Sequence, residues 1–275
     1  SCSNLTTIDL PSSVTTIGYE AFSCCTGLTS IEIPTSVTTI SENVFSWSGL
    51  TSIELHSSVT AIGAGAFAWC YNLASIGLPS SITTIGESAF SACTGLTSIE
   101  LPNSVTTIGS YAFDGCTNLT SVIYNGGAYG EFIFRGCPVS DLTFGGTIVP
   151  EHITYFLGIR ESLKRLALTD RVTTIGENAF WGCNGLTSIE LPSSVTTIRD
   201  SAFSGCFGLT SIEIPNSVTA IGVNAFASCP NLTSVIYNSD AYADGMFNGC
   251  SVSDLTFGGT AVPDNIAYRL GIRGA

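Results

Sequence analysis

Apolar and polar residues follow one repeating pattern along most of this chain. Between positions 96 and 116 the sequence reads LTSIELPNSVTTIGSYAFDGC. The string recurs at a spacing of 23 residues, with one interval of 22 between Leu28 and Leu50. We place this one-residue deletion between Phe45 and Trp47, in a loop where a change of length is tolerated. The leading leucines of the repeats are Leu5, Leu28, Leu50, Leu73, Leu96, Leu119, Leu186, Leu209 and Leu232.

Each part of the repeat predicts a structural element. The alternation in Leu-x-x-Ile-x-Leu is typical of a strand with one buried face, and Pro102 ends the strand because it lacks an N–H. Val105 and Ile108 are expected to re-enter the core from the opposite wall, and Gly109 suits a tight turn. The Ala-Phe pair at 112–113 predicts a single helical turn, with the phenylalanine inside the coil.

Stacking of these units predicts the fold class, a repeat solenoid that is mainly β with short helical turns. One coil cannot bury its own apolar face, so several coils must stack on one another. Equivalent strands then lie side by side, about 4.8 Å apart, in a parallel sheet. We expect a right-handed, curved stack of coils with this parallel sheet on its concave side.

A longer period of 113 residues is also present, because 105–160 aligns without gaps on 218–273. Each copy ends in a segment that starts with proline and ends with glycine, which predicts a short helix at 150–158 and at 263–271. Leu163 to Leu168 predicts another strand. We therefore expect one solenoid domain over 1–275, with regular repeats at 1–124 and 172–237. Irregular coils with a short helix are expected at 125–171 and 238–275, the last coil being truncated.

The string Leu-x-x-Ile-x-Leu-Pro-x-x-Val-x-x-Ile-Gly-x-x-Ala-Phe-x-x-Cys-x-x-Leu resembles the BspA-like class of leucine-rich repeats, and it covers most of the chain. The resemblance implies bacterial surface or secreted proteins that act in adhesion and protein binding, without enzymatic activity. It implies an extracellular or cell-surface location for this chain. The sequence begins and ends inside a repeat, so we expect a piece of a longer protein from which export signals and anchors are missing.

Charge narrows the range of partners. The formal net charge is −13, and Lys164 is the only lysine. Nucleic acid is not expected as a partner, because phosphate binding needs clustered Lys and Arg. No apolar run approaches the ~20 residues of a membrane span, so membrane insertion of this segment is not expected. A basic protein, another macromolecule or a neutral ligand remains as partner, and we treat the chain as a monomer.

The 11 cysteines predict a packing role. Most of them share one repeat position, where Trp47 replaces cysteine in the third coil, and free cysteine packs as a small buried apolar residue. Cys24 precedes that position and is the best candidate for a reactive thiol. No Cys-x-x-Cys motif or Cys/His cluster is present, so no metal or cofactor site is expected. The repeat position holds Cys2, Cys25, Cys70, Cys93, Cys116, Cys183, Cys206 and Cys229.

Acidic residues recur on the outward face of the predicted strands. They form two groups that we expect Arg165 to interrupt. A column of carboxylates attracts a basic partner surface. It also serves as a solvated edge that blocks pairing between sheets, and the sequence leaves both interpretations open. A flat ladder of single carboxylates is poorly suited to calcium, which needs 6–8 converging oxygens. The candidate residues are Asp9, Glu32, Glu54, Glu100, Glu190 and Glu213.

Aromatic residues in variable loops are further candidates for partner binding, chiefly Trp69 and Trp181, although packing between loops explains them equally well. Neither histidine, His56 or His152, has a nucleophile motif around it, so no catalytic residues are expected. The sequence therefore favours a non-enzymatic binding module that uses the concave sheet and adjoining loops. The alternatives are a structural spacer or stalk, and a carbohydrate-associated accessory domain of a larger secreted protein.

Overall fold

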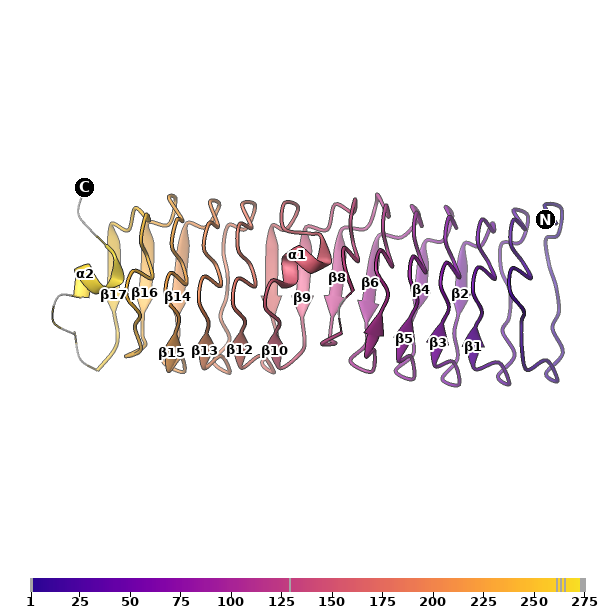
Figure 1. The fold of residues 1–275 in the computed structure, drawn as a ribbon, viewed down its shortest axis with the longest axis horizontal. Helices are drawn as coiled ribbons and strands as arrows, with labels where there is room; N and C mark the ends of the chain where they lie inside the picture. The colour runs from indigo at the N-terminus through magenta and orange to yellow at the C-terminus, as the bar shows by residue number, and fades with distance from the viewer. Residues whose placement is uncertain (1, 129, 261, 263, 265, 273–275) are drawn as a thin grey trace. The chain divides into compact units, whose positions relative to one another are not determined.

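The computed structural model describes residues 2–128, 130–260, 262, 264 and 266–272. It is a parallel-strand β-solenoid with little helix, as the repeat predicts (Figure 1). The chain forms two compact units, described separately below. Unit 1 holds residues 1–139 and 156–159, and unit 2 holds 140–155 and 160–275. Whether they act as the single predicted domain stays a prediction.

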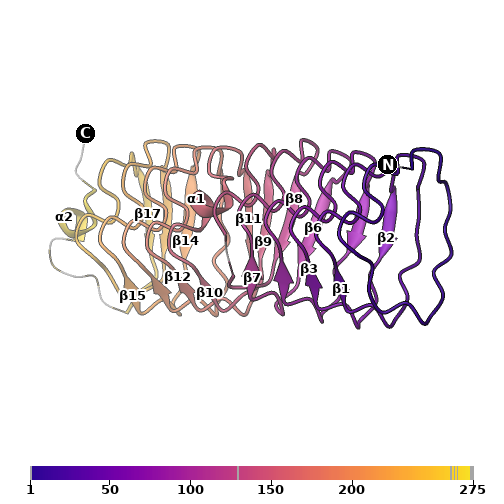
Figure 2. The ribbon, with the colours of Figure 1, turned by 45° about the vertical axis from the view of Figure 1, so that its right-hand side comes forward.

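Unit 1 has two rows of parallel strands, which Figure 2 shows along opposite sides of its coils. The longer strands come from the Leu-x-x-Ile-x-Leu part of the repeat, and the two-residue strands come from the Thr-Ile part. The longer strands are β2 (Ser52–Glu54), β4 (Ser75–Gly77), β6 (Ser98–Leu101) and β8 (Ser121–Tyr124). The short strands are β1 (Thr39–Ile40), β3 (Ala61–Ile62), β5 (Thr84–Ile85) and β7 (Thr107–Ile108).

The first two predicted strands, Leu5 to Leu10 and Leu28 to Ile33, are not formed as strands. A hydrogen bond from Thr51 N–H to the Thr29 carbonyl, 3.0 Å long, joins the second of these segments to the third. The side chains keep the predicted alternation all the same, since Ile31 is buried and its neighbours Ser30 and Glu32 are exposed.

Unit 2 repeats this arrangement. Its longer strands are β9 (Asp141–Phe144), β11 (Arg165–Leu168), β14 (Ser211–Ile214), β16 (Ser234–Tyr237) and β17 (Asp254–Phe257). Its short strands are β10 (Ile148–Val149), β12 (Thr174–Ile175), β13 (Thr197–Ile198) and β15 (Ala220–Ile221). The strand predicted at 163–168 is thereby confirmed as β11, within a coil that departs from the repeat.

Short helices occur at both predicted places, α1 (Ile153–Leu157) and α2 (Ile266–Leu270). The expected start of the second, Pro263, lies outside the described residues, as do the last three residues of the truncated coil, 273–275. In the regular coils the Ala-Phe part forms consecutive β-turns in place of the predicted helical turn. Tyr111 and Gly115 have φ of 60° and 70°, and Asp114 N–H donates to the Tyr111 carbonyl at 2.9 Å.

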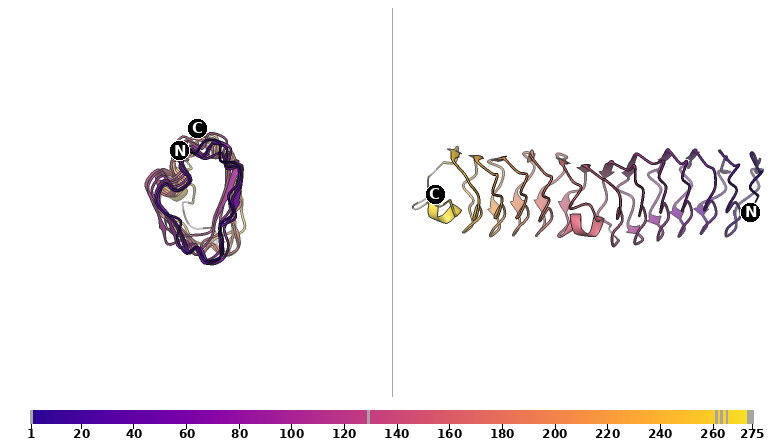
Figure 3. Two further views of the ribbon diagram at one scale, coloured as in Figure 1. Left: turned by 90° about the vertical axis from the view of Figure 1, so that its right-hand side faces the viewer. Right: turned by 90° about the horizontal axis from the view of Figure 1, so that it is seen from above.

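These turns leave alternate backbone groups for the next coil. Tyr111 N–H donates to the Glu131 carbonyl at 3.0 Å, and Phe113 N–H donates to the Ile133 carbonyl at 2.8 Å. A third wall of the coil is therefore joined by hydrogen bonds without being a strand, which satisfies backbone groups that burial would otherwise leave unpaired. Figure 3 shows that successive coils of unit 1, from indigo to magenta, follow nearly the same outline.

The interior of each unit is a set of columns, one residue type to a column. Phenylalanine rings stack from coil to coil, with centroids 4.9 Å apart between Phe90 and Phe113 and 5.2 Å apart between Phe180 and Phe203. Both rings of each pair are fully buried. Stacked aromatic pairs add about 0.5–1.5 kcal/mol each beyond the burial of apolar area. The phenylalanine, leucine and isoleucine columns therefore hold the coils in register.

Candidate functional site

The outward side chains of the longer strands form a surface that we call the strand face. In unit 1 it carries Asp9, Glu32, Glu54 and Glu100, and in unit 2 it carries Glu190 and Glu213; all six are exposed. The isoleucines between them point inward and are buried. The predicted alternation is therefore confirmed at every one of these carboxylates, while a role for them in binding stays a prediction.

The acidic column is not continuous, because the strand register places other residues within it. Glu54 on β2 pairs with Gly77 on β4, and Glu100 on β6 pairs with Ile123 on β8. The predicted sequence of carboxylates therefore has a gap of one coil at Gly77. Stacked carboxylates about 5 Å apart repel by about 0.8 kcal/mol per pair in water, and this gap removes two such contacts.

Two of the carboxylates are hydrogen-bonded by the coil that follows. Asn125 Nδ2 donates to Glu100 Oε1 at 3.1 Å, and Asn238 Nδ2 donates to Glu213 Oε1 at 3.0 Å. The two pairs are related by the 113-residue period of the sequence. The amide fixes one carboxylate oxygen in place and leaves the charge on the strand face.

Arg165 does not interrupt the acidic column, which corrects the sequence prediction. Leu166 pairs with Ile189, so Ala167 lies in register with Glu190 and Arg165 lies in register with Ser188. Arg165 is thus in the neighbouring serine column, where its guanidinium pairs with Asp141 of β9. A hydrogen bond from Ser140 and the Arg165 pairing lower the pKa of the Asp141 carboxyl. The sequence showed both flanks of Leu166 but not which flank continues the column.

Shallow hollows follow the strand face between neighbouring coils. One hollow in unit 1 is lined by Glu32, Glu54 and His56, and one in unit 2 is lined by Asp141, Arg165 and Glu190. These are open depressions in a sheet and not enclosed cavities. They suit the side chains of a macromolecular partner better than a small molecule, which is usually taken up in a concave pocket that buries most of its surface.

His56 is occupied by structural hydrogen bonds. Its Nε2–H donates to the Pro34 carbonyl at 2.8 Å, and its Nδ1 accepts from Ser58 N–H at 3.2 Å. Both ring nitrogens are therefore used to hold the turn that proline forms in other repeats. Within the described ranges, His, Cys, Asp and Glu residues form no group of three or more that could hold a metal ion.

The exposed tryptophans differ between the two units. Trp69 of unit 1 is 39% exposed and stacks on Trp47, with centroids 5.2 Å apart, while Tyr71 contacts Trp47 edge-on at 5.6 Å. Trp181 of unit 2 is 48% exposed, and the guanidinium of Arg160 lies 5.0 Å from the centre of its ring. The structure therefore brings Trp69 into a cluster and covers one side of Trp181 with a cation of its own unit.

Trp47 does not take the place of cysteine, as the sequence alone suggested. Ser48 does so: it is buried, and its hydroxyl lies 3.3 Å from the Cys70 sulfur. Trp47 and Trp69 are equivalent, because both have φ of 60° and both donate their N–H to the next coil. The one-residue deletion therefore falls between Ser48 and Leu50, and not between Phe45 and Trp47. Conformation decided this register, and the sequence carries only a weak signal of it.

The cysteine column is buried, as predicted. Each thiol donates to the carbonyl of a phenylalanine of a preceding coil, for example Cys93 to Phe67 at 3.0 Å. Burial raises the pKa of Cys70 to about 11 and that of Cys183 to about 12, so both stay protonated near neutral pH. All 11 cysteines are free thiols. The column also takes in Cys137 and Cys250, whose thiols donate to Phe113 and Phe226.

Cys2 is exposed although the repeat places it in the buried column, because the structure contains no earlier coil to cover it. Cys24 is half-buried and has φ of 58°, in agreement with its position outside the column. Its backbone N–H donates to the Ser46 carbonyl at 2.8 Å. Reactivity of its thiol stays a prediction.

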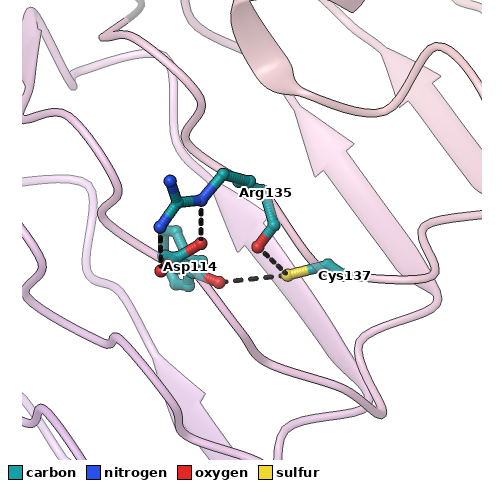
Figure 4. Close-up of polar contacts among 4 residues, drawn as sticks. Asp114, Arg135 and Cys137 are labelled. Carbon is teal, nitrogen blue, oxygen red and sulfur yellow. Dashed lines mark hydrogen bonds and ion pairs between the residues drawn. The ribbon is translucent and has the colours of Figure 1, made fainter.

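One ion pair links neighbouring coils next to the cysteine column of unit 1. Arg135 Nε and Nη2 donate to the two carboxylate oxygens of Asp114 at 2.8 and 2.9 Å, and the guanidinium lies 4.5 Å from the centre of the Tyr111 ring (Figure 4). Exposed pairs of this kind contribute about 0–1 kcal/mol. We interpret the pair as a clamp between coils.

The helices of the described chain are five residues long, too short to cross a membrane. A family model described as the BspA type leucine rich repeat region matches residues 1–120, 38–156 and 151–266. None of the curated proteins matches the sequence.

Solved structures similar to this chain come from several bacteria. A leucine-rich repeat protein from Bacteroides ovatus is 30% identical over 86% of this chain and 79% of its own, with a TM-score of 0.44. A leucine rich cell surface protein from Faecalibacterium prausnitzii is 25% identical over 98% of this chain and 83% of its own, with a TM-score of 0.43. The pneumococcal vaccine antigen PcpA is 22% identical over 86% and 69%, with a TM-score of 0.41.

Proposed function

The chain belongs to the BspA-type leucine-rich repeat family, and from that premise we propose that it is a protein-binding module whose strand face takes a basic partner surface. Stacked repeats present an extended surface of the kind that serves protein interaction. The proposal keeps the surface or secreted location and the adhesion role that the family resemblance implies. It assigns no catalytic step to the chain.

The observation that carries the proposal is the set of exposed carboxylates on the strand face of unit 1. Glu32 and Glu54 come from neighbouring coils and border one hollow, so their fields add at the same place. The net charge of −13 increases the attraction for a cationic partner at a distance. Complementary charge of this kind raises association rates and selects the partner, and salt weakens it.

The test reverses the charge of the strand face and compares it with the same change elsewhere in unit 1. The first variant replaces Glu32, Glu54 and Glu100 with Lys. The control replaces Glu42, Glu87 and Glu131 with Lys; these residues are also exposed but follow the short-strand row. Both variants change the net charge equally, so any difference between them depends on the place of the charge.

Surface plasmon resonance against purified extracellular proteins, grouped by isoelectric point, provides the measurement. We expect the wild type to bind at least one basic protein, with affinity that falls as salt rises. The strand-face variant should lose that binding, while the control variant keeps it and both melt at the wild-type temperature. Equal loss in the two variants would show an effect of net charge alone. Absence of binding to every basic protein would favour the spacer alternative.

A further inference from the structure

Three exposed aromatic side chains gather at one edge of unit 1, which we call the aromatic edge: Trp47, Trp69 and Tyr71. They are 44%, 39% and 45% exposed. The two tryptophan rings are nearly parallel, at 14°, and Tyr71 stands at 83° to Trp47. The three rings thus form an open corner with two aromatic walls at a right angle.

Local conformation does not explain the tryptophans. Trp47 and Trp69 both have a left-handed backbone with φ of 60°. In other coils of unit 1 the same position is Gly115 or Gly136, also with positive φ. Glycine adopts this conformation without strain, whereas a bulky side chain does so at a cost in stability. Packing does not explain them either, because the rings lie outside the buried columns.

The surroundings of the aromatic edge carry no charge. Segments 43–53 and 64–76 contain no Asp, Glu, Lys or Arg, and neither do segments 21–31 and 88–99 of the adjoining coils. The exposed polar side chains of these turns are neutral, for example Thr26 and Asn72. In a chain of net charge −13, this is a neutral surface with aromatic rings and uncharged hydrogen-bonding groups. It complements a ligand that is itself neutral, polar and partly apolar.

The size of the edge favours a small ligand over a second protein. A large aromatic side chain has about 150–250 Å² of surface. At the exposed fractions above, three such rings offer on the order of 200–300 Å², well below the about 800 Å² per partner of a stable protein interface. A few sugar rings can cover this area, whereas a second copy of this chain would have to use surface beyond it.

We infer that the aromatic edge binds an uncharged carbohydrate chain, independently of the partner proposed for the strand face. The C–H face of a pyranose ring packs on the tryptophan stack, and its hydroxyl groups bond with the neutral side chains around it. Aromatic side chains with a polar atom suit a ligand that is apolar on one face and polar on the other. Trp181 lacks this arrangement, because it has no aromatic neighbour of its kind and Arg160 covers it.

The test uses a double variant, Trp47→Gly and Trp69→Gly, which removes both rings and installs the residue that other coils have at this position. Because glycine accepts φ of 60°, we expect the variant to fold. Tyr71→Ala is a second variant at the same edge, without a change at a left-handed position. Trp181→Phe is the control, and it leaves Trp47 and Trp69 as the only tryptophans.

The probes are soluble neutral polysaccharides, namely laminarin, xyloglucan, galactomannan and dextran, with polygalacturonate as the acidic comparison. We expect at least one neutral polysaccharide to retard the wild type in native affinity gels and to shift the tryptophan fluorescence of the Trp181→Phe variant. The double variant should lose about tenfold or more in affinity, a change of about 1.4 kcal/mol, and Tyr71→Ala should weaken binding as well. Both should sediment and melt as folded protein.

Three results would overturn the inference. The first is that no neutral polysaccharide retards the wild type, or that polygalacturonate alone does. The second is that retardation persists in the double variant. The third is that the wild type sediments as a dimer and the double variant as a monomer, since the edge would then be covered by a second copy of this chain.

Discussion

At the scale of single residues, the cysteine column shows how a repeat position joins coils through its side chain. Each buried thiol donates to the phenylalanine carbonyl of a preceding coil, as Cys70 does to Phe45 at 3.0 Å. Ser48 takes the same position in the third coil, where its hydroxyl contacts the Cys70 thiol. The position therefore requires a small side chain with a donor, and cysteine supplies one with little polarity to bury.

The raised thiol pKa values predict a loss of stability in alkaline solution. The unfolded chain ionises its thiols near the ordinary pKa of 9.0, while the folded chain holds Cys70 protonated up to about 11. The unfolded state therefore binds fewer protons between these values, and stability falls as pH rises through that window. Each unit of pKa shift corresponds to about 1.4 kcal/mol. We expect the melting temperature to be constant from pH 7 to 8 and to fall above pH 9.

The Cys70→Ser variant separates this effect from other titrations in the same range, including tyrosine. Serine occurs naturally at the equivalent position, Ser48, and does not ionise. The variant should lose less stability than the wild type between pH 9 and pH 11, as followed by circular dichroism melting. Identical pH dependence in the two proteins would contradict the assignment of the effect to the buried thiol.

At the scale of elements, the isoleucine-glycine turn that ends each short strand sets how closely coils approach. Gly109 follows β7, and a Cβ there would lie 2.3 Å from the Glu87 backbone nitrogen. Gly18 follows the same Thr-Thr-Ile sequence but has nothing within 4 Å. The sequence predicted a tight turn at both. The structure shows that Gly109 is required for close contact between coils, a property of the stack that no single repeat contains.

This pair supplies a matched test of coil contact. Gly109→Ala should destabilise the protein by about 1–3 kcal/mol, because backbone must move to admit the methyl group. Gly18→Ala should change stability by less than about 0.5 kcal/mol, as is usual at an exposed site. Urea unfolding of both variants gives the comparison. Equal effects in the two would mean that the turn sequence, and not the neighbouring coil, sets the need for glycine.

Strands and helices were predictable where the repeat is regular, and also in the irregular segments where alternation or a proline-glycine pair remained. β11 and α1 were both expected from such signals. Register across the sheet was not predictable for Arg165, because both flanks of Leu166 look outward and only pairing with Ile189 decides between their columns. The same limit placed Trp47 one position from its true equivalent.

At the scale of the whole molecule, two levels of repetition produce the surfaces. The 23-residue repeat gives every coil the same buried columns, while the 113-residue period gives the units matching elements such as β8 and β16. Differences between coils then fall on exposed positions. The carboxylates of the strand face could be found from the sequence by alternation. The aromatic edge could not, because its three rings come together only through coil stacking and a deletion that shifts the local register.

Thiol accessibility tests the stacking of coils most directly, because one residue type reports on equivalent positions along the chain. Native protein is alkylated with iodoacetamide, digested and mapped by mass spectrometry, beside a sample unfolded in guanidinium. The stack predicts fast modification of exposed Cys2 and partial modification of half-buried Cys24, with Cys93, Cys116 and Cys206 modified only after unfolding. Fast modification of these three in protein that still melts cooperatively would contradict the in-register stack, and with it every surface described above.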